Sequence, residues 1–161
     1  MGSSGTTLVE IEDLYRRRGR DFYRLVLART GDSALAQDAV QEGFARAIRA
    51  RASFRASGPL DAWICRCILN AAHDAASQQP RGDVLEEPVE VTVTDASSEP
   101  ELRRALRTLP PRQRDALFLR FYLDFDYATI AEILGVEIGT VSATLHTARN
   151  TLAQALEEVV R

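Results

Sequence analysis

Apolar residues recur three and four positions apart along most of the chain, and this spacing predicts amphipathic helices rather than strands. In the first half it predicts helices at about residues 8–29, 33–50 and 59–77. Gly31 suits the end of the first helix, and Asp32 suits the N-cap of the second. The predicted buried face of these three helices comprises Leu8, Ile11, Leu14, Tyr15, Phe22, Leu25, Val26, Leu35, Ala39, Val40, Phe44, Ile48, Leu60, Trp63, Ile64, Cys67, Ile68 and Ala71.

The second half is predicted to form four helices, and the last two have the layout of a DNA-binding helix-turn-helix. Asp126 suits the N-cap of a short helix, Gly135 lies in the turn, and a long helix begins near Ile138. The second helix of such a motif enters the major groove with its N-terminal residues toward the bases. The pattern therefore predicts DNA as a partner. The two earlier helices are expected at about 99–107 and 111–122, and the apolar residues of the latter are Ala116, Leu117, Leu119 and Phe121.

The segment between the two halves differs in composition. Residues 81–100 hold one arginine and six carboxylates, with prolines at intervals, which is typical of a linker. Its VEVTVT stretch alternates like a strand but has no partner strand. The predicted fold is therefore all-α, with two small helical domains joined by an acidic flexible linker at 79–98. The N-terminal domain, 8–78, has three helices, and the C-terminal domain, 99–161, has four. Residues 1–7 are expected to be disordered or foreign to the natural protein.

Charge adds less to this interpretation than the pattern does. The net charge is −3, so no overall basic field indicates nucleic acid. All 20 basic residues are arginine, which reflects either codon bias or selection for the planar group that grips phosphate. No run of 18 apolar residues and no signal peptide is present, so we expect a cytoplasmic protein without membrane insertion.

Catalytic chemistry finds little support in the sequence. Cys65, Cys67 and His73 are close in sequence, but residues two apart on a helix point in nearly opposite directions. The two thiols are therefore expected to be small buried side chains rather than metal ligands. No glycine loop for phosphate and no nucleophile elbow is present. The prediction is a protein that is not an enzyme and needs no metal or cofactor.

Three segments, in this order, resemble bacterial RNA polymerase sigma factors of the extracytoplasmic-function (ECF) group. ALAQDAVQEGFARAIRA, at 34–50, is similar to the helix of that family that binds core polymerase. FRASGPLDAWICRCILNAAHD, at 54–74, is similar to its promoter-melting segment. The stretch at 109–152, which contains the helix-turn-helix, is similar to its module for the −35 element. The resemblance covers about residues 8–158. It implies a sigma region 2-like domain followed by a region 4-like domain.

The resemblance implies that the helix at 34–50 docks on a coiled coil of the largest polymerase subunit. A row of carboxylates and amides suits a basic partner helix that forms hydrogen bonds. The alternative is a helix face that is simply solvated. The residues implied in core binding are Asp38, Gln41, Glu42, Phe44 and Arg46.

The promoter-melting segment would hold an unpaired base of the −10 element, which requires a pocket and backbone contacts. Arg66 and Asn70 lie four apart on one helix face, where both reach a strand. Trp63 is either a core residue, which we favour, or a stacking platform. Phe54 is either a loop anchor or part of the pocket. The −10 candidates are Ser53, Phe54, Arg55, Trp63, Arg66 and Asn70.

The resemblance also implies contacts to the −35 element, but here the chain departs from the family. In the promoter-melting segment the family often has arginine at the positions of Asp61 and Leu69, so promoter engagement is expected to be weaker or more sensitive to salt. In the −35 module the family commonly has Lys or Arg at the positions of Ser142, Thr144, Thr147 and Asn150. Basic side chains make the commonest specific contact, to guanine, so these departures weaken the expected base readout. The arginines before the motif either touch phosphate or form a solvated surface. The −35 candidates are Arg112, Arg120, Thr140, Ser142, Thr144, His146 and Arg149.

Two hypotheses follow. The favoured one is a sigma factor that binds core RNA polymerase, recognises −10 and −35 promoter DNA, initiates transcription and is controlled by an anti-sigma factor. The alternative is a sigma-like interaction protein that binds core polymerase or an anti-sigma regulator and has weak or no promoter reading. Under either hypothesis we expect the free chain to be a monomer.

Overall fold

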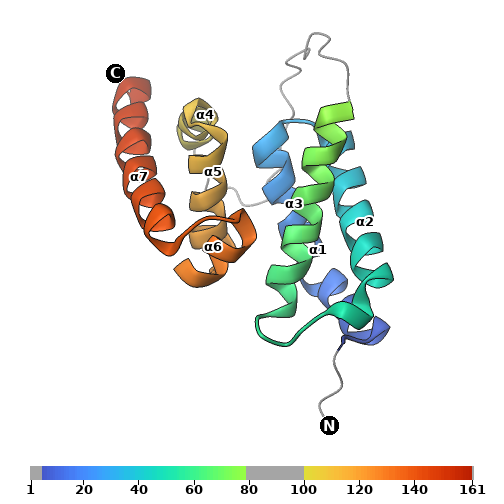
Figure 1. Ribbon diagram of the computed structural model, residues 1–161. Helices are drawn as coiled ribbons and strands as arrows, with labels where there is room; N and C mark the ends of the chain where they lie inside the picture. Colours follow the sequence, from blue (N-terminus) through green and yellow to red (C-terminus); the bar gives the residue numbers. More distant parts are fainter. Residues whose placement is uncertain (1–4, 79–99, 161) are drawn as a thin grey trace. The chain divides into compact units, whose positions relative to one another are not determined.

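The computed structural model describes residues 5–78 and 100–160, which belong to two compact units. We refer to them as unit 1 (5–78) and unit 2 (100–160). Every regular element within these two ranges is a helix, which confirms the predicted all-α fold (Figure 1). The predicted acidic linker at 79–98 lies outside the described residues.

Unit 1 consists of α1 (Leu8–Thr30), α2 (Ser33–Arg49), the short 3₁₀ turn η1 (Arg51–Ser53) and α3 (Leu60–Gln78). The helix ends follow local chemistry that the sequence already contains. Gly31 adopts the left-handed conformation (φ 69°) that ends α1, and the Asp32 carboxylate accepts the Leu35 N–H at 3.0 Å. The bounds therefore agree with the predicted ones to within one or two residues.

Two residues of the segment predicted to lie outside the fold instead take part in it. Thr7 caps α1 by accepting the Glu10 N–H at 3.2 Å, and the Glu10 carboxylate accepts the Thr7 N–H at 2.8 Å. The Thr6 N–H donates to the carbonyl oxygen of Arg51 at 3.0 Å. The start of α1 is therefore tied to the turn that follows α2.

The core of unit 1 contains most of the predicted apolar positions. Three predicted positions are exposed instead: Leu8 (51%), Tyr15 (50%) and Ile48 (37%). Leu69, which was not predicted as core, is buried on α3, and Cys65 is buried as expected. Additional positions of α3 are buried because both α1 and α2 cover this helix and enclose a wider stripe of its surface.

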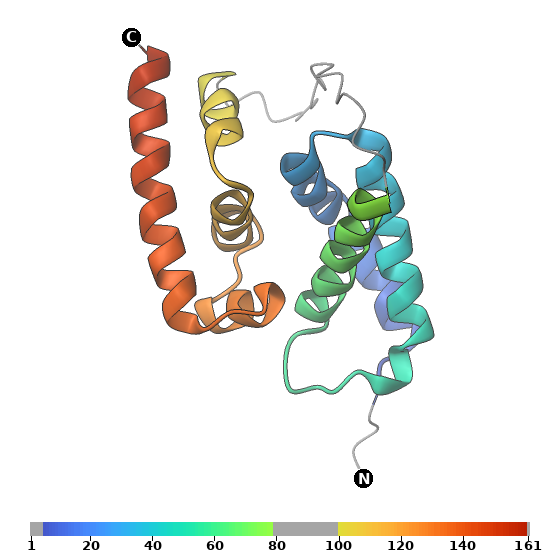
Figure 2. The same ribbon diagram turned by 45° about the horizontal axis from the view of Figure 1, so that its top comes forward.

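A close approach of α2 and α3 determines the geometry of unit 1. The two helices run side by side (Figure 2), with Gly43 of α2 facing Ile68 of α3. A Cβ atom added to Gly43 would lie 2.6 Å from the Ile68 Cα, closer than two carbon atoms can pack. Gly43 therefore permits a helix separation that any other residue at this position would prevent.

Unit 2 consists of α4 (Pro100–Thr108), α5 (Pro111–Leu117), the π-helical turn η2 (Phe118–Tyr122), α6 (Tyr127–Leu134) and α7 (Ile138–Val160). The predicted single helix at 111–122 changes pitch at Phe118. The Leu123 N–H bonds to the Phe118 oxygen at 3.1 Å, and Asp124 then takes a positive φ of 59°. This wider turn leaves Phe121 58% exposed, although it was predicted among the apolar positions.

The helix-turn-helix is present as predicted. The Asp126 carboxylate accepts the Thr129 N–H at 2.8 Å, and the hydrogen bonds from Thr129 lower the pKa of Asp126. Gly135 ends α6 with a φ of 66°. The chain direction changes by 98° between α6 and α7, within the range of about 90–120° typical of this motif. The buried positions of α7 include Val141, Leu145 and Ala148, which are four and three positions apart and form the inner face of its first three turns.

None of the helices in the described ranges is, by itself, both long and apolar enough to cross a membrane. The pair α6 and α7 meets that test only when joined across the bend of the helix-turn-helix.

We predict that Gly43→Ala lowers the free energy of unfolding of unit 1. Overpacking of this kind costs about 1–3 kcal/mol, which exceeds the gain of up to about 1 kcal/mol in helix propensity. Denaturant unfolding followed by Trp63 fluorescence reports on unit 1, because Trp63 is the only tryptophan in the chain. Gly19→Ala in α1 is the matched control within unit 1, since a Cβ there meets only the Tyr15 ring, at an ordinary contact distance of 3.5 Å. A Gly43→Ala protein as stable as the parent would contradict the close-approach account.

Candidate protein-binding and nucleic-acid-binding surfaces

The exposed face of α2 carries the residues predicted to bind polymerase, with one exception. Asp38 and Gln41 are exposed, and neither side chain bonds to another described residue. Phe44 is only 5% exposed and contacts the rings of Tyr15 and Phe22, at centroid distances of 5.0 and 6.2 Å. Phe44 is therefore a core residue that supports the surface from beneath, which corrects its assignment as a contact residue.

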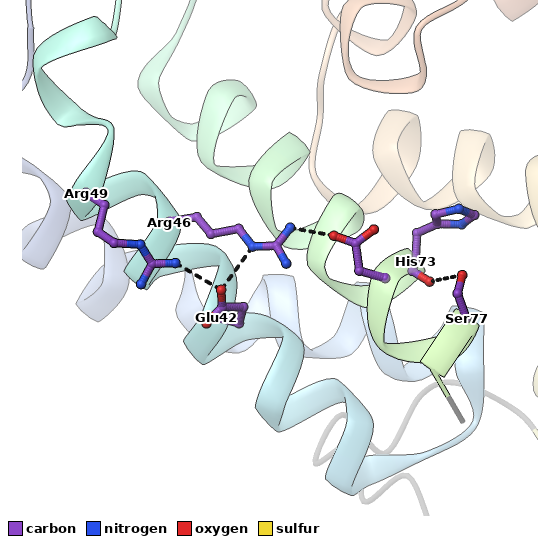
Figure 3. A network of polar contacts seen from close by, with 6 residues as sticks. Glu42, Arg46, Arg49, His73 and Ser77 are labelled. Carbon is purple, nitrogen blue, oxygen red and sulfur yellow. Dashed lines mark hydrogen bonds and ion pairs between the residues drawn. The ribbon is translucent and has the colours of Figure 1, made fainter. Parts of the chain in front are cut away.

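Glu42 and Arg46 are already engaged in a chain of ion pairs (Figure 3). The Glu42 carboxylate accepts hydrogen bonds from Arg46 and Arg49, each at 3.0 Å. Both bonds lower the pKa of Glu42, and the bond from Arg46 has the larger effect. Arg46 also donates to Asp74 of α3 at 2.8 Å. The Arg46 side chain is thus directed toward α3, and the Glu42 charge is largely balanced within the chain.

The loop after α2 is anchored by aromatic packing. Phe54 is 8% exposed, and its ring lies 5.1 Å from the ring of Trp63 at a tilt of 50°. Of the two alternatives for Phe54, this burial favours the loop anchor. Ser53 and Arg55 remain exposed on either side of Phe54, and the Ser53 hydroxyl donates to the Ala50 oxygen at 2.7 Å. The loop therefore has a fixed centre and two accessible polar neighbours.

The outer face of α3 presents Arg66 and Asn70 to solvent, one turn apart, as predicted. The two departures from the family on this helix have different structural meanings. Leu69 is 5% exposed, so its position faces the core and not a DNA strand. Asp61 is paired with Arg18 of α1 at 2.9 Å, which balances its negative charge. Sequence reasoning missed Arg18 because it lies 43 residues from its partner.

The arginines before the helix-turn-helix have different roles. Arg112 is exposed near the start of α5. Arg120 donates to the Phe125 oxygen at 3.1 Å, and its guanidinium lies 5.7 Å from the ring centroid of Tyr127. Arg120 thereby supports the turn between η2 and α6, a role that neither of the sequence alternatives anticipated.

The exposed surface of α7 carries hydroxyls and only one arginine. Thr140, Ser142 and His146 are exposed, whereas Thr144 is half-buried. Arg149 is the only Lys or Arg within Ile138–Val160. Its guanidinium lies 4.9 Å from the ring centroid of Phe121, the residue that the π-helical turn exposes. The single positive charge of α7 is therefore held by an aromatic ring from η2.

Metal-binding groups do not converge anywhere in the ranges 5–78 and 100–160. Cys65 is buried and Cys67 is half-buried, and burial raises the pKa of the Cys67 thiol.

The helix-turn-helix of unit 2 is typical of DNA-binding proteins that act in transcription. Comparison with known proteins identifies that class. Residues 14–82 match the family model for Sigma-70 region 2, and residues 100–152 match the model for Sigma-70, region 4. The chain belongs to the sigma-70 family and, within it, to the ECF group of RNA polymerase sigma factors.

Individual relatives support this assignment along most of the chain. The chain is similar to the ECF RNA polymerase sigma factor SigM of Mycobacterium tuberculosis, with 32% identity over 151 residues, 90% of this chain and 76% of SigM. It is also similar to the RNA polymerase sigma factor YlaC of Bacillus subtilis, with 30% identity over 155 residues, 86% of this chain and 87% of YlaC.

Solved structures agree at the level of the fold. The sigma factor RpoE from Bartonella quintana, in complex with the anti-sigma factor NepR, matches with a TM-score of 0.74 at 21% identity, over 93% of this chain and 98% of RpoE. CnrH, in complex with the cytosolic domain of CnrY, matches with a TM-score of 0.72 at 20% identity, over 94% of this chain and 90% of CnrH.

We predict that Phe121→Ala weakens promoter binding by the polymerase holoenzyme about two- to fivefold, the range expected for an exposed cation–π contact. The reason is that Arg149 loses the ring that orders it. Arg149→Ala should weaken binding further and reduce the slope of log K against log salt concentration by about one, since one phosphate contact is lost. Phe121→Tyr, which keeps an aromatic face, is the control. Tighter binding by Phe121→Ala would mean that the ring competes with DNA for Arg149.

Proposed function

We propose that this chain docks on core RNA polymerase through α2, and that it captures the unpaired strand of the −10 element with α3 and the loop that precedes it. Unit 2 adds contacts to the −35 duplex. The observation that carries the proposal is the pair of accessible rows on adjacent helices. Asp38 and Gln41 are accessible on α2, and Arg66 and Asn70 are accessible on α3.

The polymerase contact rests on Asp38 and Gln41 more than on Glu42. An unpaired carboxylate attracts a basic partner helix more strongly than a carboxylate that already accepts two arginine hydrogen bonds. Asp38 is exposed and forms no ion pair with another described residue. It is therefore the strongest candidate for recognition of polymerase.

The −10 contact combines a charge with an amide. Arg66 is suited to a phosphate and Asn70 to the edge of a base, while the loop with Ser53 and Arg55 borders the same segment. Strand opening by such a surface needs no bond-making side chain. It needs only that the unpaired strand binds better than the duplex does. Accordingly, the proposal includes no catalytic residue and no cofactor.

The −35 contact is proposed to read backbone and shape rather than base edges. The early turns of α7 offer the hydroxyls of Thr140 and Ser142, which suit phosphate oxygens, and the helix N-terminus favours anions. His146 and Arg149 follow on later turns. Because no Lys or Arg lies on the first turns, little discrimination between bases is expected there. Promoter choice would therefore depend mainly on the −10 element.

Regulation by an anti-sigma factor is part of the proposal. RpoE of Bartonella quintana, which shares this fold, was solved in complex with the anti-sigma factor NepR. Function on polymerase also implies a cytoplasmic location. A second candidate function, a sigma-like protein that binds polymerase or a regulator without reading promoters, is favoured by one observation: α7 has a single arginine.

The proposed function predicts transcription that depends on the chain. Run-off transcription with purified core polymerase and a library of promoter templates should give transcripts with defined start points only when the chain is present. Arg66→Ala with Asn70→Ala should remove the transcripts without removing core binding. If the unaltered chain binds core polymerase but no template yields a transcript, the second candidate function replaces the first.

The core contact predicts a specific effect of charge. Asp38→Arg should lower affinity for core polymerase at least tenfold, because like charges across an interface are strongly unfavourable. Glu132→Arg, an equal charge change at an exposed position of α6, is the matched control and should leave affinity within about twofold. Fluorescence anisotropy of the labelled chain titrated with core polymerase measures both. If Asp38→Arg and the parent bind core polymerase with equal affinity, Asp38 is not part of the interface.

A further inference from the structure

The outer face of α3 carries a third polar residue in line with Arg66 and Asn70. Asp74 follows Asn70 by four positions, so the three side chains lie along one face of the helix. Asp74 is half-exposed, with a side-chain exposure of 50%. A carboxylate at this point repels a phosphate backbone unless a positive charge balances it.

The balancing charge comes from the neighbouring helix. Arg46 of α2 donates through Nη1 to Asp74 at 2.8 Å and through Nε to Glu42 at 3.0 Å (Figure 3). Its Nη2 group forms no hydrogen bond with another residue of unit 1 that the structure describes. The Arg46 guanidinium therefore has donors left for a further acceptor, beside the row that is proposed to hold the DNA strand.

Arg46 reaches from α2 to α3. The positive charges of Arg46 and Arg66 both act on the Cys67 thiol, where they oppose the rise in pKa that burial causes. Arg46 also reaches α3 directly, through its bond to Asp74, four positions beyond Asn70. Asp38, in contrast, has no contact with Arg46. Arg46 therefore links Glu42 of α2 to the end of the polar row on α3.

We propose that Arg46 binds a phosphate of the unpaired −10 strand, and that Asp74 is a built-in competitor that releases Arg46 when the strand arrives. This inference rests on the proposed function of α3. The Arg46 side chain is 34% exposed, and a half-exposed ion pair contributes little to stability, so its exchange for a phosphate costs little. An arginine–phosphate contact is charge-assisted and can be bidentate, which favours the exchange. The Arg46–Asp74 pair would thus lower the affinity for promoter DNA without preventing binding.

The competitor model predicts opposite effects for the two partners. Asp74→Asn frees Arg46 and should tighten binding of the holoenzyme to promoter DNA about two- to fivefold, the range for an exposed ion pair. Arg46→Gln should weaken binding and reduce the slope of log K against log salt by about 0.7, the value for one phosphate of a single strand. In the double variant the reduced slope should persist, because Asp74→Asn acts only through Arg46.

The experiment uses the full chain bound to core polymerase and a fragment of a template that is active in run-off transcription, with its −10 strand left unpaired. Dissociation constants are measured over a range of KCl concentrations, and thermal unfolding of each variant checks the fold. Glu12→Gln is the matched control, because it breaks an ion pair with Arg16 (2.7 Å) on α1 and makes the same change in net charge. It should leave affinity unchanged.

The outcomes separate this inference from the function on which it rests. If the unaltered holoenzyme binds the fragment but Asp74→Asn binds equally or more weakly, the competitor model is wrong and the proposed function stands. If Glu12→Gln raised the affinity for the fragment as much as Asp74→Asn does, the competitor model would also be wrong, because the change in net charge alone would explain the higher affinity. If the unaltered holoenzyme binds no promoter fragment although core binding is intact, the proposed function itself fails.

Discussion

The close packing of α2 against α3 is the constraint on which the rest of unit 1 depends. It exists because Gly43 presents no side chain to Ile68, so the two helix backbones approach each other. Arg46, one turn beyond Gly43, is thereby brought within 2.8 Å of Asp74. The helix proposed to bind polymerase is thus joined, through one side chain, to the helix proposed to bind the −10 strand.

The two units use their arginines differently. In unit 1, Arg18 pairs with Asp61 and Arg46 pairs with Asp74, in each case on another helix. In these pairs each arginine on or beside α3 has a carboxylate that balances its charge. In unit 2 the arginines near the helix-turn-helix contact aromatic rings, as Arg149 does with Phe121. The recognition helix therefore has little charge beyond Arg149 with which to grip DNA.

Much of the fold could be predicted from the sequence, because helix ends depend on neighbouring residues. Asp32, Gly31, Asp126 and Gly135 act within four positions of themselves, and the helices begin and end where they indicate. The π-helical turn at Phe118–Tyr122 was not predictable in this way, since the helical pattern continues through it. The functional sites were harder to predict from the sequence. The helical periodicity placed Phe44 on the buried face, whereas the Arg46–Asp74 pair depends on packing between residues far apart in sequence, which no local pattern encodes.

The central claim is that unit 1 provides most of the sequence reading and unit 2 mainly holds the backbone. Transcription initiation from a promoter in which every base pair of the −35 and −10 elements is varied in turn tests this claim directly. The account predicts large losses of transcript for changes in the −10 element and small ones for changes in the −35 element. Equal or greater losses from the −35 element would contradict it, because α7 would then read bases with hydroxyls and Arg149 alone.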